Sequence, residues 1–150
     1  MPFEEKLSWV NAVVMLVVPV AYFVIMLGRL ADVSAADISY QRPLLIAIGV
    51  SIVLTIVGSI LAGIGTGISA ELRGRSASDE IDRKDERDKQ ISRHGDLIGF
   101  SVSSVGMVGV LALTMLEYDY FWIASELYLS FVVGTLVGSV VKLVAYRRGF

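Results

Sequence analysis

The chain has 150 residues, of which 55% are hydrophobic, and its formal net charge is −2 at pH 7. A soluble domain spreads its apolar residues at helical or strand spacing, whereas here they form long blocks separated by charged connections. Cysteine is absent, which excludes disulfides and thiolate metal sites such as zinc ribbons. The composition therefore favours a protein whose solvent is the lipid bilayer.

The first apolar block covers residues 9–28 and reads WVNAVVMLVVPVAYFVIMLG, without an ionisable residue. At 1.5 Å per residue, it is long enough to cross a hydrocarbon core of roughly 30 Å. The small residues at 33–35 could suit a signal peptidase, but the start, MPFEEK, sets two Glu against one Lys. A signal peptide needs a positive start and a shorter apolar run, so we expect a retained span.

Three further blocks follow. Residues 44–69 and 97–116 carry no charge, and residues 121–145 carry only Glu126 and Lys142. Because backbone amides in lipid must be satisfied within their own segment, apolar runs of this length predict helices rather than strands. The expected fold is all-α: one polytopic membrane domain with four transmembrane helices.

The connection at 70–96 is dense in charge and contains SDEIDRKDERDKQISRHGD. Acids placed four residues before bases favour a solvated helix, so we expect a charged cytosolic helix between the second and third spans. Gly95 would close it as a left-handed cap, and Asp96 would begin the next span. The pairs are Asp79 with Arg83, Glu80 with Lys84, and Asp85 with Lys89.

This charged segment has two interpretations. It is either a solvated face that keeps two spans in register, or a docking surface for a cytosolic protein. From residue 71 to 96 it holds seven bases against eight acids, so nucleic acid is not an expected partner. Oxygen ligands suit divalent cations, but no glycine-containing loop of EF-hand spacing is present, and no metal is expected. The candidate partner-binding residues are the acids Asp82, Asp85, Glu86 and Asp88.

The string KDERDKQI, residues 84–91, stands just before a span. It resembles the "DER" segment of families of small, uncharacterised bacterial multi-span membrane proteins, over about 15 residues. The resemblance implies a bacterial source and a cytosolic placement of the segment. Some such proteins are thought to act beside small helix-turn-helix regulators, which would suit a docking helix. It implies no catalytic residue.

Basic residues predict the orientation. The connection at 70–96 is rich in Lys and Arg, the chain after 145 holds Arg147 and Arg148, and the connection at 117–120 has neither. Since Lys and Arg accumulate on the cytoplasmic side, we expect both termini and the charged segment to be cytosolic. The expected location is the cell membrane.

Small residues recur at spacing four in three spans. Such stripes let helix backbones approach closely in lipid, either within one chain or across a homodimer, and both remain open. The stripes are Ser51, Thr55, Ser59, Gly63 and Gly67; Gly95, Gly99 and Ser103; and Ser130, Gly134 and Gly138.

Glu126 lies one turn inside the fourth span and shares the face of Ser130, Gly134 and Gly138. An intramembrane carboxylate is a functional candidate by default, although this one is near enough to the boundary to reach the interface. His94 is the only histidine, and no catalytic set or cofactor motif can be assembled. We therefore expect no enzyme and no cofactor, but an interaction or regulatory protein that presents its charged helix to a partner. The alternative is a small transporter or channel that uses Glu126 as a proton or cation site.

Overall fold

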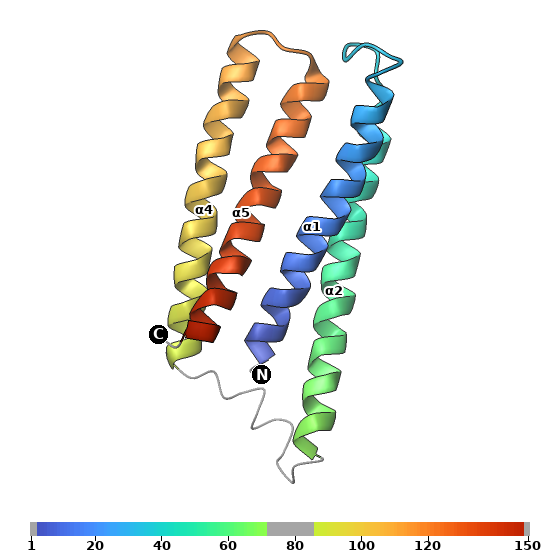
Figure 1. The fold of residues 1–150 in the computed structure, drawn as a ribbon. Helices are drawn as coiled ribbons and strands as arrows, with labels where there is room; N and C mark the ends of the chain where they lie inside the picture. Colours follow the sequence, from blue (N-terminus) through green and yellow to red (C-terminus); the bar gives the residue numbers. More distant parts are fainter. Residues whose placement is uncertain (1–2, 72–85, 149–150) are drawn as a thin grey trace.

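The structure is a computed structural model that describes residues 3–71 and 86–148. Four long helices make up nearly all of this part of the chain (Figure 1). Each is long and apolar enough to cross a membrane, as the apolar blocks predicted. The protein is therefore an all-α, multi-pass membrane protein. The helices are α1 (Phe3–Arg29), α2 (Gln41–Glu71), α4 (Glu86–Met115) and α5 (Tyr120–Arg148).

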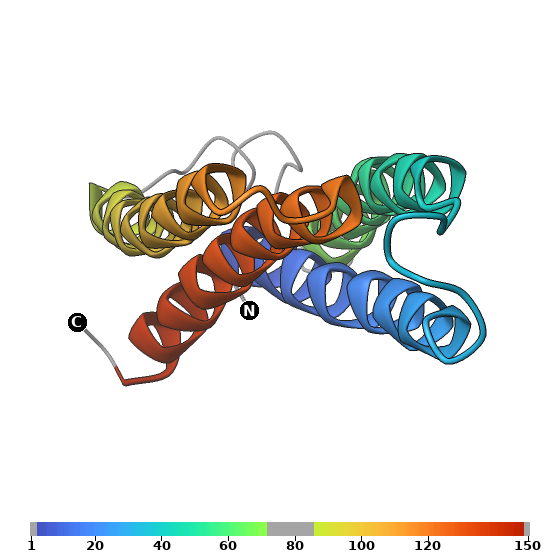
Figure 2. The ribbon, with the colours of Figure 1, turned by 90° about the horizontal axis from the view of Figure 1, so that it is seen from above.

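The helices stand side by side in an open layer, in the order α2, α1, α5, α4. The extensive contacts join α4 to α5, α5 to α1 and α1 to α2, and the view from above shows α2 and α4 on opposite sides of α1 and α5 (Figure 2). The described chain begins and ends at one end of this layer, which we call the terminal end. The connections at 30–40 and 116–119 lie at the other, the loop end.

Local chemistry explains where the helices begin and end. Pro43 lies in the first turn of α2, where its missing N–H leaves no hydrogen bond unmade. The acids Glu4 and Glu5 lie in the first turn of α1, and Arg29 lies in its last, which complements the helix dipole. Pro19 is tolerated inside α1, as is common in membrane helices.

A tight turn joins α4 to α5. The backbone N–H of Tyr118 donates to the carbonyl of Leu113 at 3.1 Å, and Glu117 adopts a positive φ of 56°. This is the pattern of a Schellman-type helix end. Because the turn is short, α5 returns antiparallel to α4 and in direct contact with it along its length.

The aromatic core lies in the loop half, where α1, α2 and α5 meet. Met26 and Phe121 are fully buried there. The rings of Tyr22 and Tyr128 stack edge to face with centroids 5.4 Å apart, and Tyr40 contacts Phe121 in the same way at 5.9 Å. Edge-to-face pairs of this kind stabilise a packed core beyond the area they bury. The aromatic core thus joins the α1–α2 pair to α5.

The expectation of a separate charged helix is corrected for residues 86–96. These residues are the first turns of α4, which runs without interruption into the apolar span. Gly95 is inside the helix and is not a left-handed cap. Glycine occurs here because of packing between helices and not because the helix ends. Gly95 is buried against α5, and the absence of a side chain allows the two helices to approach closely. The rest of the predicted helix, residues 72–85, lies outside the described residues.

Candidate functional site

The predicted site residues fall in different places. Asp82 and Asp85 lie outside the described residues. Glu86 is the first residue of α4, and Asp88 lies half-buried in the same turn. Glu126 lies in the second turn of α5, the helix that begins at the loop end. Of the candidate docking residues, Glu86 and Asp88 are therefore at the opposite end of the molecule from Glu126.

Asp88 lines a polar groove at the terminal end. Its neighbours in this groove are Ser92 and Asp96, which follow at spacing four and so share one face of α4. Lys89 and Arg93 line the groove from the adjacent ridge of the helix, and Glu4 contributes from α1. The groove has a volume of about 360 Å³. We call these six residues the charged groove; it offers three acids and two bases.

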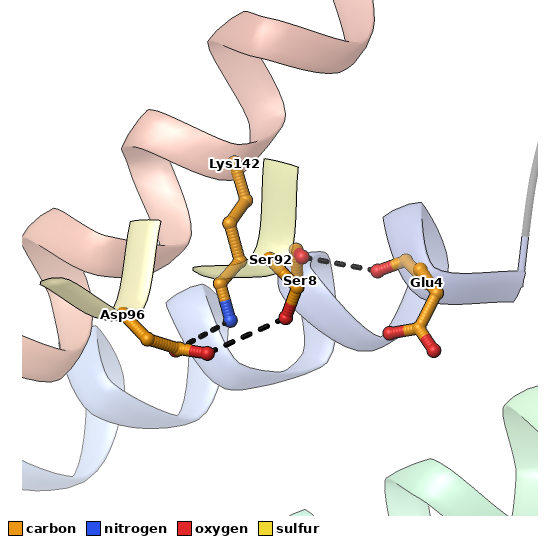
Figure 3. A network of polar contacts seen from close by, with 5 residues as sticks. All are labelled: Glu4, Ser8, Ser92, Asp96 and Lys142. Carbon is orange, nitrogen blue, oxygen red and sulfur yellow. Dashed lines mark hydrogen bonds and ion pairs between the residues drawn. The ribbon is translucent and has the colours of Figure 1, made fainter. Parts of the chain in front are cut away.

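An ion pair fixes one wall of the charged groove to α5. The Nζ of Lys142 donates to Oδ1 of Asp96 at 2.7 Å, and the Oγ of Ser92 donates to the other carboxylate oxygen at 3.4 Å (Figure 3). The Lys142 side chain is 19% exposed, whereas that of Asp96 is 68% exposed. Lys142 thus lies along the protein surface while its amine reaches the polar rim, and the Asp96 carboxylate remains largely exposed.

Residues of α1 complete the terminal end. The Oγ of Ser8 donates to the backbone carbonyl of Glu4 at 3.0 Å (Figure 3), and the adjacent Glu5 is buried. The guanidinium of Arg147 lies 5.5 Å from the ring centroid of Trp9, a cation–π contact that ties the end of α5 to the start of α1. The groove is therefore lined by α1 and α4, and at this end both helices are held to α5.

Small residues line the seam between α4 and α5. A Cβ placed on Gly99 would lie 2.6 Å from the carbonyl oxygen of Gly134, and one on Gly138 would lie 2.9 Å from that of Gly95. The Oγ of Ser103 donates across the seam to the carbonyl of Ser130 at 3.2 Å. In lipid, where apolar side chains gain little by leaving the solvent, such close backbone packing and interhelical hydrogen bonds hold helices together.

Glu126 lies at the loop-end continuation of this seam. Its carboxylate packs against Gly109, where an added Cβ would lie 3.2 Å from Oε1. The side chain is half-buried, and its backbone carbonyl accepts the hydroxyl of Ser130 at 2.8 Å. Toward the terminal end, the seam closes by direct contact of the two backbones. The structure thus places Glu126 on the α4 side of α5, above a closed seam.

Among the residues that the structure describes, no group of three or more His, Cys, Asp or Glu side chains is placed to hold a metal ion. His94 is exposed on the charged part of α4. It lies next to Arg93 and Gly95 in the chain rather than beside further nitrogen or sulfur ligands.

Sequence reasoning missed a cluster of buried hydroxyls in the apolar region. The residues Tyr22, Ser51, Ser125 and Tyr128 are each at least nine-tenths buried, and their hydroxyl oxygens are almost completely enclosed by the protein. Tyr22 lies beside Ser125, and Tyr128 lies beside Ser51. The available signal was a tyrosine in the middle of an apolar run, since tyrosine normally favours the membrane boundary.

Comparison of this chain with protein-family models, with curated proteins and with solved structures found no match.

Proposed function

We propose that this protein is an integral membrane interaction or regulatory protein that presents the charged groove to a cytosolic protein partner. The observation that carries the proposal is the shape of α4. Its charged first turns are a rigid continuation of a membrane-spanning helix, and they form the groove together with Glu4. A partner would dock through complementary charges, which give specificity and fast association rather than high affinity alone.

The orientation belongs to the same proposal. Both ends of the described chain and the charged groove lie at the terminal end. This end carries Arg147 and Arg148, whereas the short connection at 116–119 contains no Lys or Arg. The positive-inside tendency therefore places the terminal end in the cytosol of a cell whose plasma membrane holds the protein. The resemblance of residues 84–91 to the "DER" segment favours the same side.

Transport through Glu126 is the second candidate. An acid within an apolar span that faces another helix is the feature that favours it. The closed contact of Gly99 with Gly134 on the terminal side of Glu126 leaves no room for an ion along the seam. We therefore rank the docking function above transport.

A photo-crosslinking amino acid placed at position 92 in living cells tests the docking function. Ser92 lines the charged groove, so a defined protein adduct is expected there. The same probe at the exposed Ser34, at the loop end, serves as the matched control and should give none. Asp88→Lys should remove the adduct at position 92, whereas Asp37→Lys, a similar reversal at the loop end, should not.

The two candidate functions give opposite results with Glu126→Gln, which removes the charge at nearly constant volume. The docking function predicts an unchanged adduct at position 92. If this variant instead abolishes a proton-dependent or cation-dependent flux in proteoliposomes, and Asp88→Lys leaves the adduct intact, the transport function replaces the docking function.

A further inference from the structure

A polar cavity lies at the loop end, between the connection at 30–40 and the turn that joins α4 to α5. It has a volume of about 660 Å³ and is also lined by the first residues of α2 and α5, and both connections lie at this end of the layer (Figure 1). We call it the loop-end cavity. Its volume is in the range of small-molecule sites, whereas a single inorganic ion would leave most of it empty.

The lining of the loop-end cavity carries charge of one sign. Glu117 and Asp119 line it, and none of its lining residues is basic. Within the described part of the chain, neither carboxylate has an ion-pair or hydrogen-bond partner. A cleft lined by charge of one sign concentrates ions of the opposite sign, so this lining favours a cation. The connections and helix ends around it are acidic as well, with four acids against two bases: Asp32, Asp37, Glu117 and Asp119 against Arg29 and Arg42.

Aromatic rings are the second property of the lining. Tyr40 lines the cavity from the connection at 30–40, and Tyr118 and Tyr120 line it from the opposite side. Tyr40 is half-buried and Tyr118 is 52% exposed, so an occupant can reach both rings. Tyr40 packs edge to face on the fully buried Phe121, which holds its ring in place. The face of an aromatic ring attracts a cation, and quaternary ammonium ions are recognised in this way.

The two properties together select an organic cation over a metal ion. Calcium needs about 6 to 8 oxygen ligands, and no group of three or more acidic, histidine or cysteine side chains in the described chain is placed to hold a metal ion. An alkylated ammonium ion instead uses both parts of the lining. Its charge is countered by the carboxylates, and its alkyl groups contact the tyrosine rings.

The backbone shows that the fold does not require a carboxylate at position 117. Glu117 has a φ of 56°, in the left-handed position that ends α4. Glycine adopts this conformation without steric cost and asparagine is tolerated there, whereas glutamate is not favoured. Because the Glu117 carboxylate also bonds to no described residue, it can be removed without loss of a structural contact.

We propose that the loop-end cavity binds an organic ammonium ion, whose charge lies near the carboxylates of Glu117 and Asp119 and whose alkyl groups contact the rings of Tyr40 and Tyr118. The ammonium group belongs either to a soluble amine or to a lipid headgroup, since the cavity lies at one end of the membrane-spanning helices. The site is independent of the docking function, because it lies at the opposite end of the molecule from the charged groove and shares no residue with it.

Saturation-transfer NMR of the full chain in dodecyl maltoside micelles tests the proposal with two probes of the same shape. Choline carries a quaternary ammonium group, and its uncharged isostere 3,3-dimethylbutan-1-ol has carbon in place of the nitrogen. Choline should bind roughly 5- to 10-fold more tightly, because only choline interacts with the carboxylates and the ring faces as a cation. Equal dissociation constants for the two probes, or no binding of choline, would overturn the proposal.

Phosphatidylcholine with a deuterated headgroup, added to the same micelles, identifies the source of the ammonium group. Displacement of choline by this lipid would assign the cavity to a lipid headgroup. Unchanged binding of choline would assign it to a soluble amine.

Variants separate the cavity from the general acidity of the loop end. Glu117→Gly suits the local backbone and should lower choline affinity roughly 3- to 10-fold in a protein that circular dichroism shows to be folded. Asp32→Asn removes an equal charge outside the cavity and should change the affinity less than about twofold at physiological salt. Tyr118→Leu should weaken binding, whereas Tyr118→Phe keeps the ring and should not. Equal effects of Glu117→Gly and Asp32→Asn, or of the two Tyr118 variants, would overturn the proposal.

Discussion

Glycine at positions 99 and 134 is required by distance and not by backbone conformation. Both residues lie inside helices, and the carbonyl oxygen of Gly134 stands where a side chain on Gly99 would begin. Gly49 of α2, by contrast, has nothing within 4 Å of an added Cβ. Two glycines in similar apolar spans thus have opposite tolerance to substitution, because one faces a backbone and the other faces open space.

Gly134→Ala should therefore destabilise the protein by about 1 to 3 kcal/mol through overpacking, since its Cβ would collide with Ser103 and Gly99. Gly49→Ala is the matched control and should be neutral or stabilising by up to about 1 kcal/mol, because alanine loses less conformational freedom on folding. Unfolding titrations in mixed micelles measure both. Equal effects of the two substitutions would place Gly134 outside the contact.

Lys142 combines a charge contact with a packing contact. Asp96 is largely exposed, so Asp96→Asn should cost only about 0 to 1 kcal/mol. Lys142→Met, which keeps the aliphatic stem over Gly95, should cost about as little. Lys142→Ala should cost more than Lys142→Met because it also removes that stem. Equal losses in Lys142→Met and Lys142→Ala, matched by an equally large loss in Asp96→Asn in the same titration, would show that the charge dominates.

At the scale of the element, α4 is one helix with two surfaces. Its first turns carry charge and form the charged groove, and the remainder packs on α5 or faces the membrane. The composition changes from charged to apolar near residue 96, and this change predicted two separate helices with Gly95 at the end of the first. Backbone hydrogen bonding does not depend on that change, since solvated and apolar residues can continue the same helix. Composition therefore locates the boundary of the apolar surface and not the boundary of the helix.

Gly95→Asn tests this continuity. Asparagine is well tolerated at a left-handed helix end, but inside the seam its Cβ would lie 2.8 Å from the carbonyl oxygen of Gly138. The substitution should therefore destabilise the protein by about 1 to 3 kcal/mol. Gly28→Asn, near the end of α1 with nothing within 4 Å, should be mild. A neutral Gly95→Asn would restore the cap interpretation.

At the scale of the whole molecule, the layer consists of two helix pairs joined mainly by the contact of α1 with α5. The pairs α1–α2 and α4–α5 meet mainly where α1 packs on α5, through the aromatic core around Met26 and Phe121. The outer helices α2 and α4 leave most of their apolar surface uncovered by the chain. Lipid or a second copy of the chain would cover it, and the homodimer that the small-residue stripes left open stays a prediction.

The chain divided within residues 72–85 should reassemble from its two co-expressed pieces through this contact. Met26→Ala should weaken co-purification of the pieces, because a fully buried Met26 leaves a cavity that costs about 2 to 5 kcal/mol. Ile25→Ala is the control, since Ile25 is mainly exposed, and should have little effect. Equal loss in both variants would show that the pieces associate through another surface.

The orientation is tested on the intact protein, which contains no cysteine. Ser92→Cys and Ser34→Cys are treated separately with a membrane-impermeant thiol reagent on intact cells. Labelling of position 34 and protection of position 92 are expected if the terminal end is cytosolic. The reverse pattern would invert the topology and remove the cytosolic partner from the proposed function.

The sequence alone determined that this is a membrane protein of four helices. Lipid supplies no hydrogen bonds to the backbone, so each long apolar block must form its own helix, and this information is local. The sequence also indicated Asp88 as a candidate binding residue. It did not indicate the groove that Asp88 shares with Glu4, because that groove depends on how helices distant in the sequence pack together. Only the tertiary structure decided the helix order, the closed seam beside Glu126 and the meeting of Ser51 with Tyr128. The physical reason is that lipid is as apolar as leucine: hydropathy shows that a segment is in the membrane, but only side-chain shape decides which of its faces meets another helix.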